Sequence, residues 1–172
     1  MFQHMIDTDI FISGGGVAGL TAAAAFGTAG FRVVIADPMP PITDNATVGA
    51  DLRTTAFLQP ARDFLDDAGL WDRLAPHATP LQIMRIVDAG GEAPVPRVTR
   101  DFDASDISDL PFGWNLPNWL LRREMMARLA ELPNVDMRMG VGFASILTRT
   151  GHARVTLSDG ARITANLVIG AD

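Results

Sequence analysis

A glycine-rich turn between an apolar segment and an alanine-rich segment constrains the fold of this chain more than any other feature. The apolar segment, Asp9–Ser13, has the composition of a buried parallel strand. The turn Gly14–Gly19 follows, and the alanines at positions 22–25 then favour a slim helix that ends near Gly30. A strand, a tight turn and a helix in this order predict a βαβ unit, and therefore an α/β fold with a parallel sheet.

Three glycines of the turn have physical roles in such a unit. Gly14 permits the tight turn, Gly16 leaves room for backbone to approach a pyrophosphate, and Gly19 lets the helix lie close to the sheet. The helix N-terminus, with Val17 and Ala18 in its first turn, offers unpaired N–H groups and the positive end of its dipole to phosphate.

An acidic residue completes the pattern. Asp37 ends the second apolar segment, residues 31–36, and lies 23 positions after Gly14. A carboxylate there can accept hydrogen bonds from ribose hydroxyls, and it would repel a 2′-phosphate. The pattern therefore predicts an adenine-dinucleotide site for FAD or NAD rather than NADP.

Composition excludes several other classes of protein. The 172 residues include 14 basic and 20 acidic side chains, no cysteine, and three scattered histidines, His4, His77 and His152. A net charge of −6 without a basic block argues against a nucleic-acid partner. We expect no disulfide and no metal site. Met1–Asp9 is too short and polar for a signal peptide, so we expect a cytoplasmic protein, with peripheral membrane attachment left open.

Hydrophobic periodicity predicts the remaining elements. We expect a loop over 38–51, a helix from Phe57 to Ala68 that Pro60 kinks or begins, a strand over 81–87, an exposed loop over 97–111, a helix capped by Asn118 that ends at Pro133, and strands over 135–139, 143–148, 153–157, 161–164 and 167–170.

Four stretches carry a resemblance to a known family. They are Asp9–Gly19 with Asp37, Asp51–Ala56 with a following helix that ends at 68–71, Leu116–Leu121, and 158–160 leading into Leu167–Asp172. Their order resembles the group A flavoprotein monooxygenases, the p-hydroxybenzoate hydroxylase-like family. Within that family the chain looks most like the ubiquinone-biosynthesis hydroxylases that act on polyprenylated phenols.

The resemblance implies a Rossmann-type FAD-binding domain over residues 1–172, with 78–116 as an incomplete β-rich excursion belonging to the substrate domain. It implies an enzyme that uses FAD, NAD(P)H and O2 to hydroxylate an aromatic substrate, and it leaves a biosynthetic complex or membrane surface open as partners. It covers only the amino-terminal part of such an enzyme. We therefore expect a fragment with weak or absent FAD retention, no hydroxylase activity, and a tendency to self-associate through uncovered apolar surface.

The resemblance also adds four residues to the expected cofactor site. Arg53 lies ahead of a predicted helix, whose dipole disfavours a cation there unless an anion lies between them, and the resemblance places it near the FAD pyrophosphate. Asn118 and Arg122, one helical turn apart, are expected near the flavin, although capping and surface roles explain them equally well. Asp172 matches an aspartate of the family. No residue is assigned as a general base.

Two other functions are compatible with the glycine-rich turn. One is an NAD-dependent oxidoreductase or flavin reductase, and the other is a non-catalytic dinucleotide-binding module. The order of Arg53, Asn118 and the final Gly170–Asp172 argues against the first of these, and the dinucleotide-binding module stays open.

Overall fold

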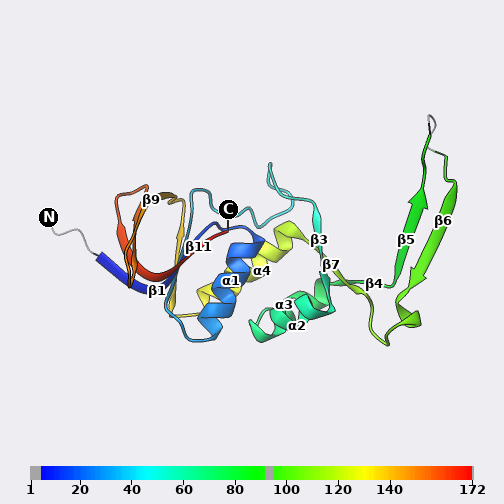
Figure 1. The fold of residues 1–172 in the computed structure, drawn as a ribbon, viewed down its shortest axis with the longest axis horizontal. Coiled ribbons are helices and arrows are strands. Elements are labelled where there is room, and N and C mark those ends of the chain that lie inside the picture. Colours follow the sequence, from blue (N-terminus) through cyan, green and yellow to red (C-terminus); the bar gives the residue numbers. More distant parts are fainter. Residues whose placement is uncertain (1–4, 92–94, 172) are drawn as a thin grey trace.

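The computed structural model of the chain describes residues 5–91 and 95–171. Its largest component is a six-stranded sheet in the order β8-β2-β1-β11-β10-β9 (Figure 1). The strands are β1 (Met5–Ser13), β2 (Val33–Asp37), β8 (Val135–Met139), β9 (Phe143–Thr148), β10 (Ala153–Leu157) and β11 (Arg162–Gly170). Strand β1 pairs in parallel with β2 and β11, and β2 pairs in parallel with β8, whereas β10 is antiparallel to β9 and β11. This arrangement confirms the predicted α/β class.

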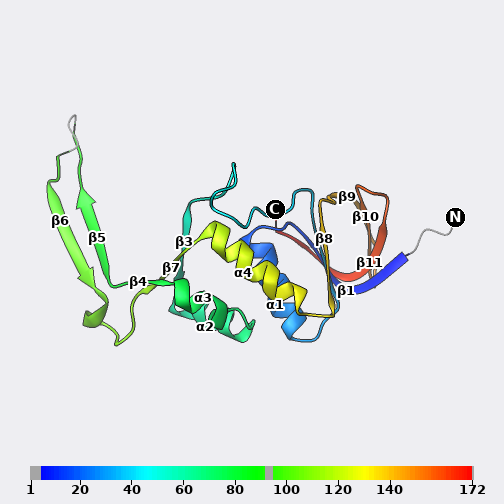
Figure 2. The ribbon, with the colours of Figure 1, turned by 180° about the vertical axis from the view of Figure 1, so that it is seen from behind.

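The two faces of the sheet carry separate apolar clusters, because alternate residues of a strand point to opposite faces. The helices are α1 (Val17–Thr28), α2 (Gln59–Asp67), α3 (Trp71–Leu74) and α4 (Asn118–Ala130), with short 3-10 turns η1 (Ala75–His77) and η2 (Ala104–Asp106). Ile12 and Ile35 belong to the cluster that includes buried side chains of α1 and α4, two helices that lie side by side (Figure 2). Phe11 and Val34 belong to the other, with Val155 and other residues of β10 and β11. Helices α1 and α4 thus pack on one face of β1 and β2, and side chains of β10 and β11 pack on the other.

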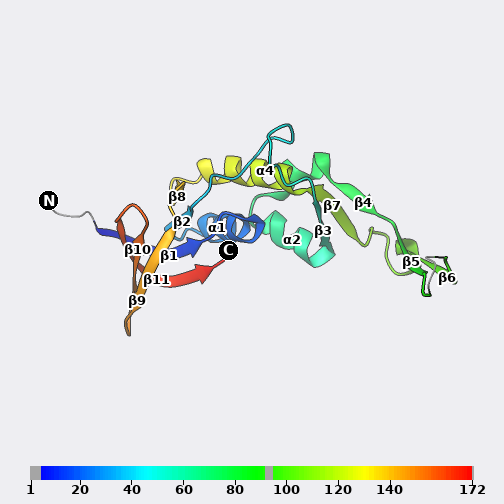
Figure 3. The same ribbon diagram turned by 90° about the horizontal axis from the view of Figure 1, so that it is seen from above.

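The rest of the chain extends away from this sheet. Strands β3 (Thr54–Leu58), β7 (Gly113–Pro117) and β4 (Thr79–Leu81) form a three-stranded antiparallel sheet, and β5 (Ile83–Asp88) pairs with β6 (Val98–Asp103) in a hairpin. Figure 3 shows the hairpin at the end of the molecule opposite β9 and β10. Every residue of β5 and β6 is exposed. No helix in the described ranges is long and apolar enough to cross a membrane.

The segment predicted as one helix from Phe57 to Ala68 is a strand followed by a helix. Phe57 and Leu58 end β3, where they pair with β7, and α2 begins at the next residue. Pro60 lies in the first turn of α2, so it begins the helix, which is one of the two predicted alternatives. Proline suits this position because an N–H in the first turn has no partner within the helix. Gly69 ends the helical segment with a φ of +70°, as predicted.

Three further element predictions were wrong. The segment 97–111 is not all loop, since β6 and η2 lie within it and Asp101 of β6 is paired with Arg85 across the hairpin rather than left to solvent. The strand predicted over 81–87 is two strands, β4 and β5, separated at Gln82, whose carbonyl accepts a hydrogen bond from η2. The two strands predicted after position 160 are one continuous strand, β11, because it pairs with β1 along almost its whole length.

Candidate functional site

A crevice lies beyond the carboxyl ends of β1 and β2, where ligands of open α/β sheets bind. It has a volume of about 460 Å³. Its walls come from the glycine-rich turn, the loop after β2, helix α4 and the end of β11. The lining residues are Ser13, Gly14, Gly15, Gly16, Asp37, Pro38, Met39, Pro40, Pro41, Ile42, Gly49, Arg122 and Ala171.

The glycines of the turn have the steric environments that their predicted roles require. Gly14 has a φ of +121°, and its N–H donates to the carbonyl of Ala36 at 2.8 Å, which closes the turn against β2. A Cβ on Gly19 would lie 1.9 Å from the Gly14 carbonyl oxygen, so this position packs helix against turn. A Cβ on Gly16 would meet nothing within 4 Å. The space beside Gly16 therefore opens onto the crevice.

The N-terminus of α1 begins at this turn. Gly16 is its N-cap residue and no side chain caps the helix, so the first-turn N–H groups receive no capping bond from a side chain. Val17, Ala18 and Gly19 form that first turn but are not among the lining residues. Any contact they make with a ligand would come through backbone N–H groups.

Asp37 faces the glycine-rich turn from the end of β2. Its Oδ2 accepts a hydrogen bond from the Gly15 N–H at 2.6 Å, and its Oδ1 accepts one from the Met39 N–H at 2.8 Å. A Cβ on Gly15 would come within 2.9 Å of the Asp37 Cβ. Gly15, to which the sequence analysis gave no role, is therefore required for the approach of this carboxylate. The signal was present in the sequence as a third consecutive glycine.

The N-terminus of α4 forms a second wall of the site, and the capping role predicted for Asn118 was wrong. Pro117 occupies the N-cap position, and Asn118 is the first residue of the helix. The buried Asn118 side chain donates to Asp51 Oδ2 at 3.0 Å and accepts from the Thr55 hydroxyl at 2.6 Å. Both ends of the amide are engaged, so Asn118 is not a lining residue of the crevice.

Arg53 also differs from its prediction. It precedes β3 rather than a helix, so the argument from the dipole of a following helix was wrong. Its guanidinium forms a bidentate pair with Asp51, with Nε–Oδ1 and Nη2–Oδ2 distances of 2.8 Å each, and its side chain is 82% exposed. Its carbonyl accepts the backbone N–H of Asn118 at 2.9 Å, which places it beside the N-terminus of α4.

Asp51 joins these groups, and the sequence analysis did not assign it a role. Its side chain is 11% exposed. The guanidinium of Arg53, followed by the amide of Asn118, holds the pKa of the Asp51 carboxyl well below its usual range. Arg122, which does line the crevice, places Nη2 3.7 Å from Asp51 Oδ2. The spacing Asp-x-Arg in the motif Asp51–Ala56 was the signal that pointed to this residue.

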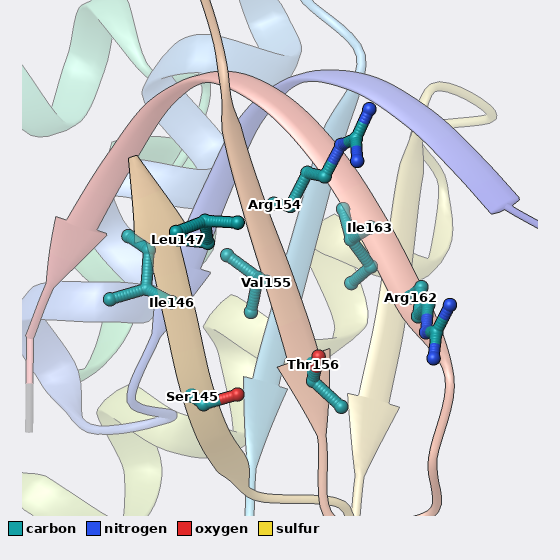
Figure 4. Close-up of a pocket in the computed structure, with 8 residues that line it drawn as sticks. All are labelled: Ser145, Ile146, Leu147, Arg154, Val155, Thr156, Arg162 and Ile163. Atoms are coloured by element: carbon teal, nitrogen blue, oxygen red, sulfur yellow. The ribbon is translucent and has the colours of Figure 1, made fainter. Parts of the chain in front are cut away.

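The structure has a second concave surface outside the crevice. A smaller concave surface of about 280 Å³ on β9–β11, which contains Arg154 and Arg162, shares no residue with it (Figure 4). No group of three or more histidine or acidic side chains that could hold a metal ion occurs within the described part of the chain. Asp172, expected at the cofactor site, lies outside the described residues.

The chain is similar in sequence to proteins named as hydroxylases. The chain is 33% identical over 164 residues to ubiquinone hydroxylase UbiL of Rhodospirillum rubrum, covering 95% of this chain and 37% of that protein. It is 31% identical over 173 residues to a 3-(3-hydroxy-phenyl)propionate/3-hydroxycinnamic acid hydroxylase of Mycolicibacterium gilvum, covering 96% and 28% of the respective chains. The chain thus spans well under half the length of these relatives.

Solved structures share the fold. p-Nitrophenol 4-monooxygenase PnpA from Pseudomonas putida superposes with a TM-score of 0.75 at 23% identity, over 98% of this chain and 41% of that one. The flavin-dependent monooxygenase PieE, solved with FAD and substrate, gives a TM-score of 0.73 at 24% identity, over 97% and 30%. Residues 7–172 match the family described as FAD binding domain, and the chain belongs to that family.

Proposed function

We propose that the chain is the FAD-binding part of a flavin-dependent monooxygenase that hydroxylates an aromatic substrate, and that the crevice holds the adenosine and pyrophosphate half of FAD. The open space beside Gly16 carries this proposal, because it lies next to an uncapped helix N-terminus at the carboxyl end of β1. The relatives UbiL and the Mycolicibacterium gilvum protein are named as hydroxylases.

The residues of the crevice fit this cofactor. Asp37 can accept ribose hydroxyls, the turn presents backbone without a side chain at Gly16, and the buried Nε of Arg122 has no hydrogen-bond partner among the described residues. When bound, FAD would supply the redox chemistry, while the protein supplies binding, orientation and electrostatics. Gly14, Val17, Ala18 and Gly19 would contribute turn geometry and backbone N–H groups.

The finer assignments are also proposals. A phenol or polyprenylated phenol of the ubiquinone pathway is supported by two relatives named ubiquinone hydroxylases, UbiL and the Neisseria meningitidis protein UbiM, which is 25% identical over 172 residues. NAD(P)H as reductant, a partial substrate-domain excursion over 78–116 and a cytoplasmic or membrane-peripheral location stay predictions.

Titration of the chain with FAD, followed by calorimetry, tests the proposed function. We expect saturable FAD binding that ADP displaces. Binding of NAD but not of FAD would instead favour the NAD-dependent oxidoreductase, and the absence of binding by either dinucleotide would contradict both functions.

The substitution Asp37→Asn is expected to weaken FAD binding about tenfold. The amide cannot accept from both backbone N–H groups that the carboxylate now satisfies, and it no longer repels a 2′-phosphate. Competition with ADP and with adenosine 2′,5′-bisphosphate measures both effects. Asp159→Asn, in the exposed turn between β10 and β11, is the control. Unchanged affinity and unchanged discrimination in Asp37→Asn would remove Asp37 from the site.

We also expect the chain to self-associate through one face of the β5–β6 hairpin. Cross-strand partners share a face, so Met84 lies beside Phe102, and Ile86 and Val98 lie on the same side, all exposed. A two-stranded sheet with an uncovered apolar face is marginally stable in water. Light scattering over a range of concentrations should show association that Met84→Ser with Phe102→Ser lowers. Val87→Ser, on the opposite face, should lower it less, and a strictly monomeric wild type would contradict the expectation.

A further inference from the structure

We propose that Asp51 is a positioning residue of the crevice, whose carboxylate fixes the guanidinium of Arg122 in the crevice wall and links it to Arg53 and Asn118. The proposal rests on the proposed function, since it concerns how the same crevice recognises the phosphate groups of its cofactor.

Both carboxylate oxygens of Asp51 are fully used as acceptors. Oδ1 accepts from the backbone N–H of Arg53 at 3.2 Å and from its Nε at 2.8 Å. Oδ2 accepts from Arg53 Nη2 at 2.8 Å and from Asn118 Nδ2 at 3.0 Å, and it lies 3.7 Å from Arg122 Nη2. An ionised carboxylate can accept at about four sites, and the four hydrogen bonds from Arg53 and Asn118 fill them. The contact with Arg122 is therefore an ion pair without a hydrogen bond.

The orientation of Arg122 depends on this carboxylate. Arginine carries high rotamer entropy, and its planar fork recognises phosphate well only when it is held in place. Asp51 is the acid paired with Arg122 in the described ranges, and it is not among the lining residues of the crevice. The Arg122 side chain lines the crevice and is 25% exposed, so it can contact an anion there.

The charges of Asp51, Arg53 and Arg122 agree with a positioning role for Asp51. One carboxylate between two guanidinium groups leaves a formal charge of +1 at the N-terminus of α4, next to the glycine-rich turn. A bound pyrophosphate would meet a net cation from this side and helix N–H groups from the other. Asp51 therefore restrains the arginines without cancelling their attraction for phosphate.

The simpler role for Asp51 is structural closure of the loop 38–53 onto α4. The two roles differ in their effect on ligands. A positioning role concerns the phosphates alone, so it should change the affinity for ADP and leave the affinity for adenosine, which lacks them, unchanged. A structural role should change both affinities together.

Asp51→Asn tests the proposal with nearly unchanged volume. In either orientation the amide NH2 faces N–H donors, those of Arg53 and Asn118 on one side or those of Arg53 on the other. Calorimetry on the 172-residue chain should show ADP binding about tenfold weaker than in the wild type, because a charge-assisted arrangement is lost, with adenosine binding unchanged. Asp44→Asn, at an exposed residue of the same loop whose carboxylate accepts from the Ala46 N–H, should behave as the wild type.

A second variant covers the case in which Asp51→Asn fails to fold. Asp51→Glu keeps the charge and moves it by one methylene, so we expect a smaller loss of preference for ADP over adenosine. An unchanged preference in Asp51→Glu, an equal loss of both ligands in Asp51→Asn, or tighter ADP binding in Asp51→Asn would each overturn the proposal. A wild type that binds neither ADP nor FAD would instead defeat the proposed function itself, and this inference with it.

Discussion

Gly19→Ala is expected to lower the free energy of unfolding by about 3 kcal/mol, the upper part of the range for inserting a methyl group into a packed site. The new Cβ would lie 1.9 Å from the Gly14 carbonyl oxygen and 3.0 Å from its carbon. Backbone atoms cannot rotate out of the way, so either α1 moves off the sheet or the turn opens. The loss outweighs the gain of about 1 kcal/mol that alanine has over glycine within a helix.

Urea unfolding followed by circular dichroism measures this effect. The same variant should lose FAD binding, because the first turn of α1 and the glycine-rich turn move apart. If Gly19→Ala unfolds at the same urea concentration as the wild type, the close contact of helix and turn is not a feature of the protein in solution.

Gly16→Ala is expected to have the opposite profile, with nearly unchanged stability and FAD binding weakened by about 100-fold, equivalent to about 2.7 kcal/mol. Its Cβ would meet no atom of the described chain within 4 Å, and the φ of −74° at Gly16 is one that alanine adopts freely. Alanine is a poorer N-cap residue than glycine, but it also lowers the entropy of the unfolded chain, and these effects of about 0.5–1 kcal/mol oppose each other.

The loss of binding follows from the space that the methyl group takes. If the pyrophosphate approaches the backbone beside Gly16, a methyl group there displaces it and breaks its hydrogen bonds to the first turn of α1. Parallel calorimetric and urea titrations of the variant separate binding from stability. Wild-type FAD affinity in Gly16→Ala would show that the cofactor does not pass this position.

The sequence predicted the βαβ unit well because local rules determine it. Gly14–Gly19 needs only local sterics to form its turn, and the apolar segments 9–13 and 31–36 are stable only as buried strands of the sheet. The helix end near Gly30 was equally predictable from the sequence, since the φ of +90° there favours glycine.

The errors arose where partners distant in sequence decide the structure. Phe57 continues a helical pattern in sequence, but pairing with β7, more than fifty residues later, makes it a strand residue. Asp101 belongs to a polar segment whose strand character depends on Arg85. Asn118 has the residue type of a cap, but its amide is taken by Thr55 and Asp51, which no local pattern reveals.

The candidate site was predictable in part for the same reason. Gly14, Gly16, Asp37 and Arg122 line one crevice. The exposed guanidinium of Arg53 is instead held by Asp51, a contact between two residues of the same motif that composition alone cannot orient.

Backbone amide chemical shifts measured by NMR during titration with FAD test the central claim most directly. The account predicts that the largest changes occur at Gly14, Gly15 and Gly16, with accompanying changes at Asp37 and Arg122, and that ADP reproduces them. Saturable FAD binding with these amides unaffected, and with changes confined to residues outside the crevice, would contradict the account.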